Sequence, residues 1–168
     1  VKAILDSANI EYVKWDMNRP LTDVGSLELT GEKAGEFYHR YVLAVYELQE
    51  RLITEFPYLL LENCSSGGGR FDAGMLYYSP QIWGSDDTDA VERTYIQTGY
   101  SYGYPMSTVS AHVSACPNHQ TLRRTPIETR FNIASFGVLG YEINLKDYPV
   151  ISERPIDLFS DVDGNFAL

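Results

Sequence analysis

Cysteine is scarce: the 168-residue sequence contains two, Cys64 and Cys116, which lie far apart in segments of different character. Such a pair does not predict a disulfide scaffold, and it fits a reducing compartment better than an oxidising one. We therefore expect a cytoplasmic protein.

Basic side chains are also few, with 13 Lys and Arg against 23 Asp and Glu and a formal net charge of -10. Nucleic acids and anionic membrane surfaces attract clustered Lys and Arg, and this composition does not supply them. Apolar runs such as Tyr58–Leu61 fall far below the roughly 20 residues that span a bilayer. We therefore expect neither nucleic acid nor a membrane as a partner.

The first residues, Val1–Asp6, contain no Met and no basic start followed by an apolar core. We expect the sequence to begin within a longer protein. With 44% hydrophobic residues over its 168 positions, it is long enough for one domain with a real core and too short for two. Aromatic residues are abundant, with 13 Tyr, 7 Phe and 2 Trp, as is common where sugars or flat ligands stack.

The spacing of apolar residues predicts strands and helices in alternation, which implies a parallel sheet. Strands are expected at Ile10–Asp16, Tyr58–Cys64, Gln81–Trp83, within Tyr104–Ser110 and at Val138–Leu145. Helices are expected from Lys33 to about Glu55, for one turn at Met75–Tyr78, over Asp89–Tyr100, and over Pro126–Phe136 with Pro126 in the first turn. Thr88 or Asp87 is expected to cap the helix that starts near Asp89.

Polar residues gather after the predicted strands, which is where a (β/α)8 barrel places its active site. Such a barrel takes roughly 250 residues, so 168 residues cannot complete one. We therefore predict an α/β fold that forms part of a (β/α)8 TIM barrel over residues 1–147, followed by an irregular tail over residues 148–168.

Two carboxylates, Asp16 and Asp86, stand at the ends of two predicted strands that are not consecutive, each close to a Trp. Such a pair can hydrolyse a glycoside, because one carboxylate attacks or stabilises the anomeric carbon while the other protonates the leaving oxygen. Helix caps and solvated loop acids are the commoner roles for residues in these positions. Position alone leaves both interpretations open.

Three segments in order carry a specific resemblance: KWDMNR at 14–19, CSSGGGRFD at 64–72 and SDDTD at 85–89. They closely resemble the signature segments of glycoside hydrolase family 36, the microbial α-galactosidases. HVSA at 112–115 and PNHQ at 117–120 continue the resemblance, which covers roughly residues 4–145. The final twenty or so residues depart from it.

The resemblance implies a role for each acid. Asp16, in KWDMNR, becomes the nucleophile that forms a covalent galactosyl-enzyme, and Asp86, the first acid of SDDTD, becomes the general acid and then the base. Asp87 is the competing assignment for the acid and is otherwise a cap or hydrogen-bonding residue. Retention of configuration follows, with carboxyl groups about 5 to 5.5 Å apart.

The resemblance also implies a sugar-binding set: Lys14, Trp15, Asn18, Cys64 and Gly67. A cation two residues before the nucleophile lies on the same strand face and stabilises its negative charge. Trp15 is either pocket wall or core, and Cys64 is either pocket lining or a small buried apolar residue. The glycines show no phosphate-loop spacing, so we expect close approach of backbone to sugar at Gly67.

A metal is the remaining alternative for His112, Cys116 and His119. These are only three ligands, without a second Cys or His pair, so we predict no metal and no cofactor. Arg123, Arg124 and Arg130 are expected to be solvated charges flanking a helix.

The resemblance therefore implies strands 4 to 8 of the barrel of a retaining α-galactosidase that acts on melibiose and raffinose-family oligosaccharides and is a homo-oligomer in its parent form. In this family the remaining barrel strands add an acidic pair that grips galactose hydroxyls. The alternative is an inactive fragment that needs the missing half-barrel from the parent chain or a partner. A non-catalytic sugar-binding module is disfavoured, because a binder needs no pair of opposed acids.

Overall fold

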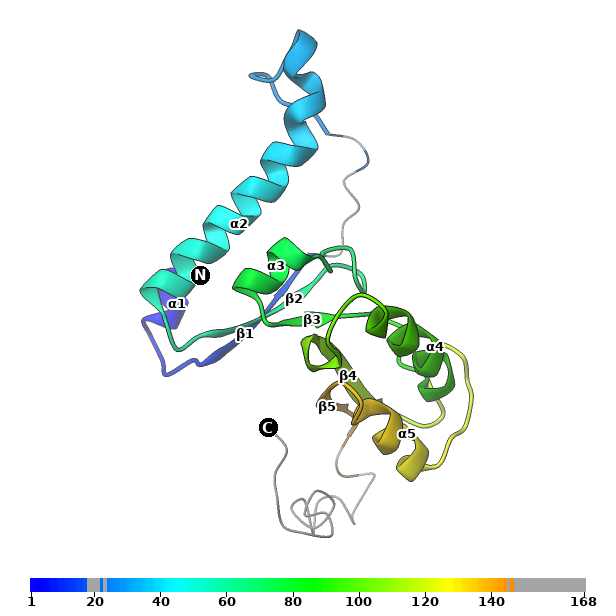
Figure 1. The fold of residues 1–168 in the computed structure, drawn as a ribbon. Helices are drawn as coiled ribbons and strands as arrows, with labels where there is room; N and C mark the ends of the chain where they lie inside the picture. Colours follow the sequence, from blue (N-terminus) through cyan, green and yellow to red (C-terminus); the bar gives the residue numbers. More distant parts are fainter. Residues whose placement is uncertain (18–21, 23, 145, 147–168) are drawn as a thin grey trace.

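The computed structural model describes residues 1–17, 22, 24–144 and 146, over which strands and helices alternate (Figure 1). The elements in chain order are α1 (Lys2–Leu5), β1 (Tyr12–Asp16), the 3-10 helix η1 (Gly31–Glu36), α2 (Phe37–Glu55), β2 (Leu60–Cys64), α3 (Ala73–Tyr78), β3 (Gln81–Trp83), α4 (Ala90–Ser101), the 3-10 helix η2 (Met106–Thr108), β4 (Val109–Ser114), α5 (Ile127–Ala134) and β5 (Val138–Glu142). No helix in this described part is long and apolar enough to cross a membrane.

The five strands form one parallel sheet in which each strand lies beside the next one in the chain, in the order β1-β2-β3-β4-β5. Sequential parallel strands joined through helices are the arrangement of a (β/α)8 barrel. Five such strands make part of a barrel, which confirms the predicted α/β fold class. The extent of the domain over residues 1–147 and the tail at 148–168 stay predictions, since the whole of that tail lies outside the described residues.

The core lies between the sheet and its helices. Leu61 on β2 packs with α1 and α2, Ile82 on β3 packs with α2 and α3, and Val113 on β4 packs with α5. These three side chains are at most 1% exposed. Apolar residues at every second strand position therefore attach the helices to one face of the sheet.

The opposite face of the sheet carries polar and aromatic residues. This face includes Lys14 of β1, Glu62 of β2 and His112 of β4. On each strand, the residues directly before and after them point toward the helices. Successive side chains of a strand point to opposite faces, so these groups lie on the inner side of the half-barrel. These three polar side chains therefore lie on the concave side of the half-barrel.

Most predicted elements shift by a few residues at their ends, and two predictions need a correction. β4 begins at Val109, beyond nearly all of the Tyr104–Ser110 segment expected to contain it, because Pro105 has no N–H and leads into the turn of η2. The N-cap of α4 is Asp89, whose carboxylate accepts hydrogen bonds from the Val91 and Glu92 amides. The assignment of this cap to Thr88 or Asp87 was wrong.

The prediction that three arginines are solvated charges is corrected for two of them. Arg130 is 5% exposed, and its guanidinium donates to the carbonyl of Ser114 at the end of β4. Arg123 pairs with Asp89 and, at 3.0 Å, with Glu92. Arg124 is exposed, as predicted. Sequence position beside a helix did not reveal that two of these cations anchor neighbouring segments.

Candidate active site

A polar cavity of about 330 Å³ opens at the carboxyl ends of the strands. Its walls come from all five strands and the loops that follow them: Lys14, Asp16, Cys64, Trp83, Asp86, Thr88, His112, His119, Gln120, Tyr141 and Glu142. Parallel strands all end at the same edge of a sheet, so residues distant in sequence meet there.

Both candidate catalytic carboxylates line this cavity. Asp16 is the last residue of β1 and pairs in register with Cys64 on β2. Asp86 follows β3 by three residues, and its Oδ1 accepts a 2.8 Å hydrogen bond from the indole Nε1 of Trp83. The structure thus brings together the two acids that the sequence placed after separate strands.

Asp87 points elsewhere. Its Oδ1 accepts a hydrogen bond from the Asp89 amide at 2.9 Å, and its own amide is bonded to the Ser85 hydroxyl at 3.1 Å. Asp87 therefore shapes the turn that leads into α4. This geometry favours Asp86 over Asp87 as the acid that faces the cavity.

Cys64 forms hydrogen bonds with the candidate nucleophile Asp16 and with the backbone of Gly67 in the loop after β2. Burial raises the pKa of the Cys64 thiol to about 11, and the hydrogen-bonded Asp16 carboxylate acts in the same direction, against a backbone hydrogen bond with Gly67. The group is therefore a thiol at neutral pH. A protonated thiol can donate to Asp16, and it is a poor nucleophile.

Gly67 has φ +68, and a Cβ built there would lie 2.4 Å from the Asp86 amide nitrogen and 2.5 Å from Ser85 Cα. Only glycine fits a left-handed position this close to another backbone. Contact with the acid-bearing loop thus accounts for glycine at this position, and its expected approach to a sugar stays a prediction. Glycine at position 67 allows the loop after β2 to pack closely against the loop after β3.

Lys14 enters the cavity from β1. Its Nζ lies 3.5 Å from Glu62 Oε1 and 4.4 Å from the centroid of the Trp83 ring. With a side chain 37% exposed, the ammonium can still reach a ligand. Lys14 lies two residues before Asp16 on the same face of β1, and both line the cavity. Stabilisation of the Asp16 carboxylate by this cation stays a prediction.

Trp15 is separated from the other candidates. It lies on the opposite face of β1 from Lys14 and Asp16, where it packs against the cluster that contains Leu5 and Leu61. Its place is the core of the domain, and we leave it out of the proposed sugar site. Asn18 lies outside the described residues.

Several wall residues were not predicted as site residues. The ring of His112 packs against that of Trp83 in a tilted arrangement with ring centroids 4.4 Å apart, and its Nδ1 is 3.6 Å from Glu142 Oε2. Burial lowers the pKa of His112, while Glu142 and Glu62 oppose this effect. Strand alternation alone could have placed His112 and Glu142 on the inner face, but only register brings them beside Trp83.

The loop after β4 supports the loop that carries the acid. The Thr88 amide donates to Gln120 Oε1 at 3.0 Å, and Asn118 Nδ2 donates to Thr88 Oγ1 at 3.1 Å. Burial alone would raise the pKa of Asp89, but hydrogen bonds from Thr121, from two α4 amides and from Arg123 lower it. The ionised Asp89 therefore ties both loops to the start of α4.

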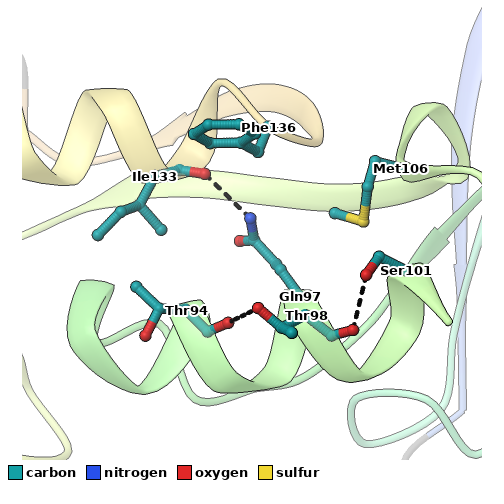
Figure 2. Close-up of a pocket in the computed structure, with 7 residues that line it drawn as sticks. All are labelled: Thr94, Gln97, Thr98, Ser101, Met106, Ile133 and Phe136. Carbon is teal, nitrogen blue, oxygen red and sulfur yellow. Dashed lines mark hydrogen bonds between the residues drawn. The ribbon is translucent and has the colours of Figure 1, made fainter.

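Within the described residues, no three His, Cys, Asp or Glu side chains are grouped so that they could hold a metal ion. A second cavity of about 260 Å³ lies between α4 and α5, lined by residues that include Gln97, Met106 and Phe136 (Figure 2). Gln97 Nε2 donates there to the Ile133 carbonyl at 3.0 Å. None of the described residues that line this cavity carries a titratable side chain, so it does not compete as the site of acid–base chemistry.

The fold and the cavity define the class: a chain of the (β/α)8-barrel type with two carboxylates and a lysine at the carboxyl ends of its strands. The melibiase family model matches residues 1–157, and the chain belongs to this family.

Alpha-galactosidase 1 of Pediococcus pentosaceus is 59% identical over 142 residues, which are 84% of this chain and 19% of that protein. The crystal structure of the alpha-galactosidase of Lactobacillus brevis superposes with a TM-score of 0.85 at 50% identity, covering 90% of this chain and 21% of that one. A variant of the GH36 alpha-galactosidase AgaA of Geobacillus stearothermophilus, crystallised with raffinose, superposes with a TM-score of 0.82 at 51% identity. The match covers 86% of this chain and 20% of that one. The chain therefore spans about a fifth of the length of these relatives.

Proposed function

We propose that these residues are the second half of the catalytic barrel of a retaining α-galactosidase, which releases terminal α-galactosyl groups from melibiose and raffinose-family oligosaccharides. The observation that carries the proposal is the convergence of Asp16, Asp86 and Lys14 on one polar cavity. The raffinose bound to the Geobacillus stearothermophilus relative supports the substrate class.

In the proposed mechanism a carboxylate oxygen of Asp16 attacks the anomeric carbon, and the bond from that carbon to the leaving oxygen breaks. Asp86 gives its proton to the leaving oxygen, so the aglycone departs as an alcohol. Asp86, now ionised, takes a proton from water, whose oxygen displaces Asp16 from the anomeric carbon. Two inversions return the α configuration, and both acids end in their starting states.

The neighbouring residues support these steps. The Trp83 N–H holds Oδ1 of Asp86, and in this mechanism Oδ2 carries the proton to the leaving group. The Cys64 thiol lies beside Asp16, where its hydrogen bond stabilises negative charge on the attacking oxygen. The Lys14 ammonium lines the same cavity and has three N–H donors, so it can donate to a sugar hydroxyl.

The test is the stereochemistry of hydrolysis by a full-length protein that contains these residues. Proton NMR of the first turnovers of a chromogenic α-galactoside should show α-galactose before mutarotation. Release of β-galactose would overturn the double displacement, and a protein without α-galactosidase activity would overturn the function.

The alternative, an inactive piece that needs the other half-barrel, is favoured by one observation. β1 and β5 are the two edges of the five-stranded sheet, and its polar inner face is not enclosed by the described elements. Size exclusion of the 168-residue chain, with an assay on the same fractions, separates the two cases. Activity in a well-defined species would favour self-association that completes the pocket, and inactivity of an aggregating chain would favour the fragment.

A further inference from the structure

Glu62 is a carboxylate on β2 whose side chain is 3% exposed. In the sheet it pairs in register with Lys14 on β1 and with Gln81 on β3. It lies beneath the cavity and does not form part of its wall. A buried carboxylate is costly unless it is paired and hydrogen-bonded, so its partners indicate its role.

Both oxygens of Glu62 are occupied. Ser110 Oγ on β4 donates to Oε1 at 2.9 Å, and the hydroxyl of Tyr12 donates to Oε2. Lys14 Nζ approaches Oε1 at 3.5 Å. Burial and the contact with Glu62 raise the pKa of Tyr12, which keeps its hydroxyl a donor. Groups from β1 and β4 thus hold the carboxylate in one place.

Lys14 connects Glu62 to the cavity. The same ammonium that pairs with Glu62 lies 4.4 Å from the centroid of the Trp83 ring, and the Trp83 N–H bonds Asp86. A flexible lysine has many rotamers, and a fixed anion below it selects the one that lies over the indole. The contacts therefore run from Glu62 through Lys14 and Trp83 to Asp86.

We propose that Glu62 is a positioning residue for the α-galactosidase reaction: by its ion pair it fixes the Lys14 ammonium over Trp83, ready to bind a sugar hydroxyl. The inference rests on the proposed function, because it assigns Lys14 to the sugar. Glu62 itself does not touch the substrate. Its removal is expected to impair binding more than chemistry, since Asp16 and Asp86 remain in place.

The test is a double-mutant cycle in the full-length protein with Glu62→Gln, Lys14→Met and the double variant. In Glu62→Gln the amide oxygen still accepts from Ser110, and the amide NH2 can donate to the hydroxyl oxygen of Tyr12, so the fold is kept while the ion pair is lost. KM for a chromogenic α-galactoside should rise about tenfold, with kcat changed less than threefold. In the Lys14→Met background, Glu62→Gln should raise KM no further.

The control is Glu47→Gln, which removes an exposed ion pair with Arg51 on α2 and should leave both constants unchanged. Glu62→Asp, which keeps the charge but withdraws it from Lys14, replaces Glu62→Gln if that variant does not fold, and it should also raise KM. An unchanged KM in either variant overturns the inference. Independent, multiplying effects of the two substitutions on KM overturn it as well, because Glu62 would then act without Lys14.

Galactose binding, measured by calorimetry on the same proteins, separates this inference from the function on which it rests. A wild-type protein that neither binds galactose nor cleaves the galactoside overturns the proposed function, and the inference falls with it. A wild-type protein that does both, while its Glu62→Gln variant binds galactose equally well, overturns the inference alone.

Discussion

The indole nitrogen of Trp83 and the carboxylate of Asp86 are joined by a hydrogen bond of 2.8 Å. Trp83 is the last residue of β3 and is 4% exposed, so its ring is held by the barrel. The ring also contacts Lys14 and His112. Trp83, on strand β3, thereby fixes Asp86, which belongs to a loop. The Lys14 ammonium that contacts the same ring comes from strand β1.

Replacement of the proposed nucleophile should abolish turnover. In the full-length protein, Asp16→Ala is expected to lower kcat by at least the order of 10³-fold, because no group remains to form the glycosyl intermediate. Azide fits the space left by the carboxylate and should restore release of a chromogenic aglycone. The recovered product should be β-galactosyl azide, since azide attacks from the face that Asp16 occupied. Absence of rescue would assign the nucleophile to another residue.

Replacement of the proposed acid should depend on the leaving group. Asp86→Ala is expected to reduce hydrolysis of raffinose by about 10²- to 10⁴-fold, because a sugar alkoxide needs a proton to depart. An aryl galactoside with an acidic phenol should lose far less in its first step. Steady-state rates on both substrates measure this difference. Equal losses would direct attention to Asp87 or to a folding defect, which circular dichroism of the variant would reveal.

The contact between Gly67 and Asp86 predicts a specific defect. Gly67→Ala places a Cβ against the Asp86 backbone at a positive φ, so it should destabilise the protein by about 1–3 kcal/mol and lower kcat/KM. Gly99→Ala is the matched control, because nothing lies within 4 Å of a Cβ at that position in α4. The control should be neutral or stabilising by up to about 1 kcal/mol. Gly67→Ala should therefore lower both the melting temperature and kcat/KM, whereas Gly99→Ala should keep or raise the melting temperature and leave kcat/KM unchanged.

His112 predicts an acid-dependent loss of stability. Burial holds its pKa below the ordinary 6.5, while Glu142 and Glu62 act to raise it and Lys14 acts with burial. Below about pH 6.5 the unfolded chain binds a proton at His112 more readily than the folded chain does. The folded state is therefore not destabilised by His112 above that pH, and it loses stability as the pH falls below it. His112→Asn should flatten the decline in melting temperature between pH 7.5 and pH 5.5.

The exposed His39 on α2 provides the control for this experiment. His39→Asn should leave the slope of melting temperature against pH as in the wild type. Parallel curves for His112→Asn and the wild type would show that protonation of His112 does not limit stability in acid.

The positions of the secondary structures and of the acids could be predicted from local patterns. Period-2 alternation in β1 and β5 and the helical period in α2 follow from burying one face of each element, and most predicted boundaries lie within a few residues of the structure. Arg130 could not be predicted in this way. Its burial depends on the position of the Ser114 carbonyl, which belongs to a strand sixteen residues earlier.

The site was predicted only in part for the same reason. Asp16 and Cys64 end strands, Asp86 follows one, and Lys14 lies two residues before the end of β1. The common direction of parallel strands explains why these residues share a cavity. Glu62 carries no local sign of function. Its importance arises from the register that sets it beside Lys14 and from Ser110, which reaches it from another strand.

The sequence by itself determined the alternation of strands and helices, the parallel sheet that follows from it, and the carboxylates at the strand ends. These depend on periodicity and on residue types over short stretches of chain. Only the tertiary structure decided that Trp15 faces the core, that Gly67 supports the acid loop, and that Trp83 holds Asp86. Such relationships depend on register and on contacts between loops, which arise only when distant segments pack together.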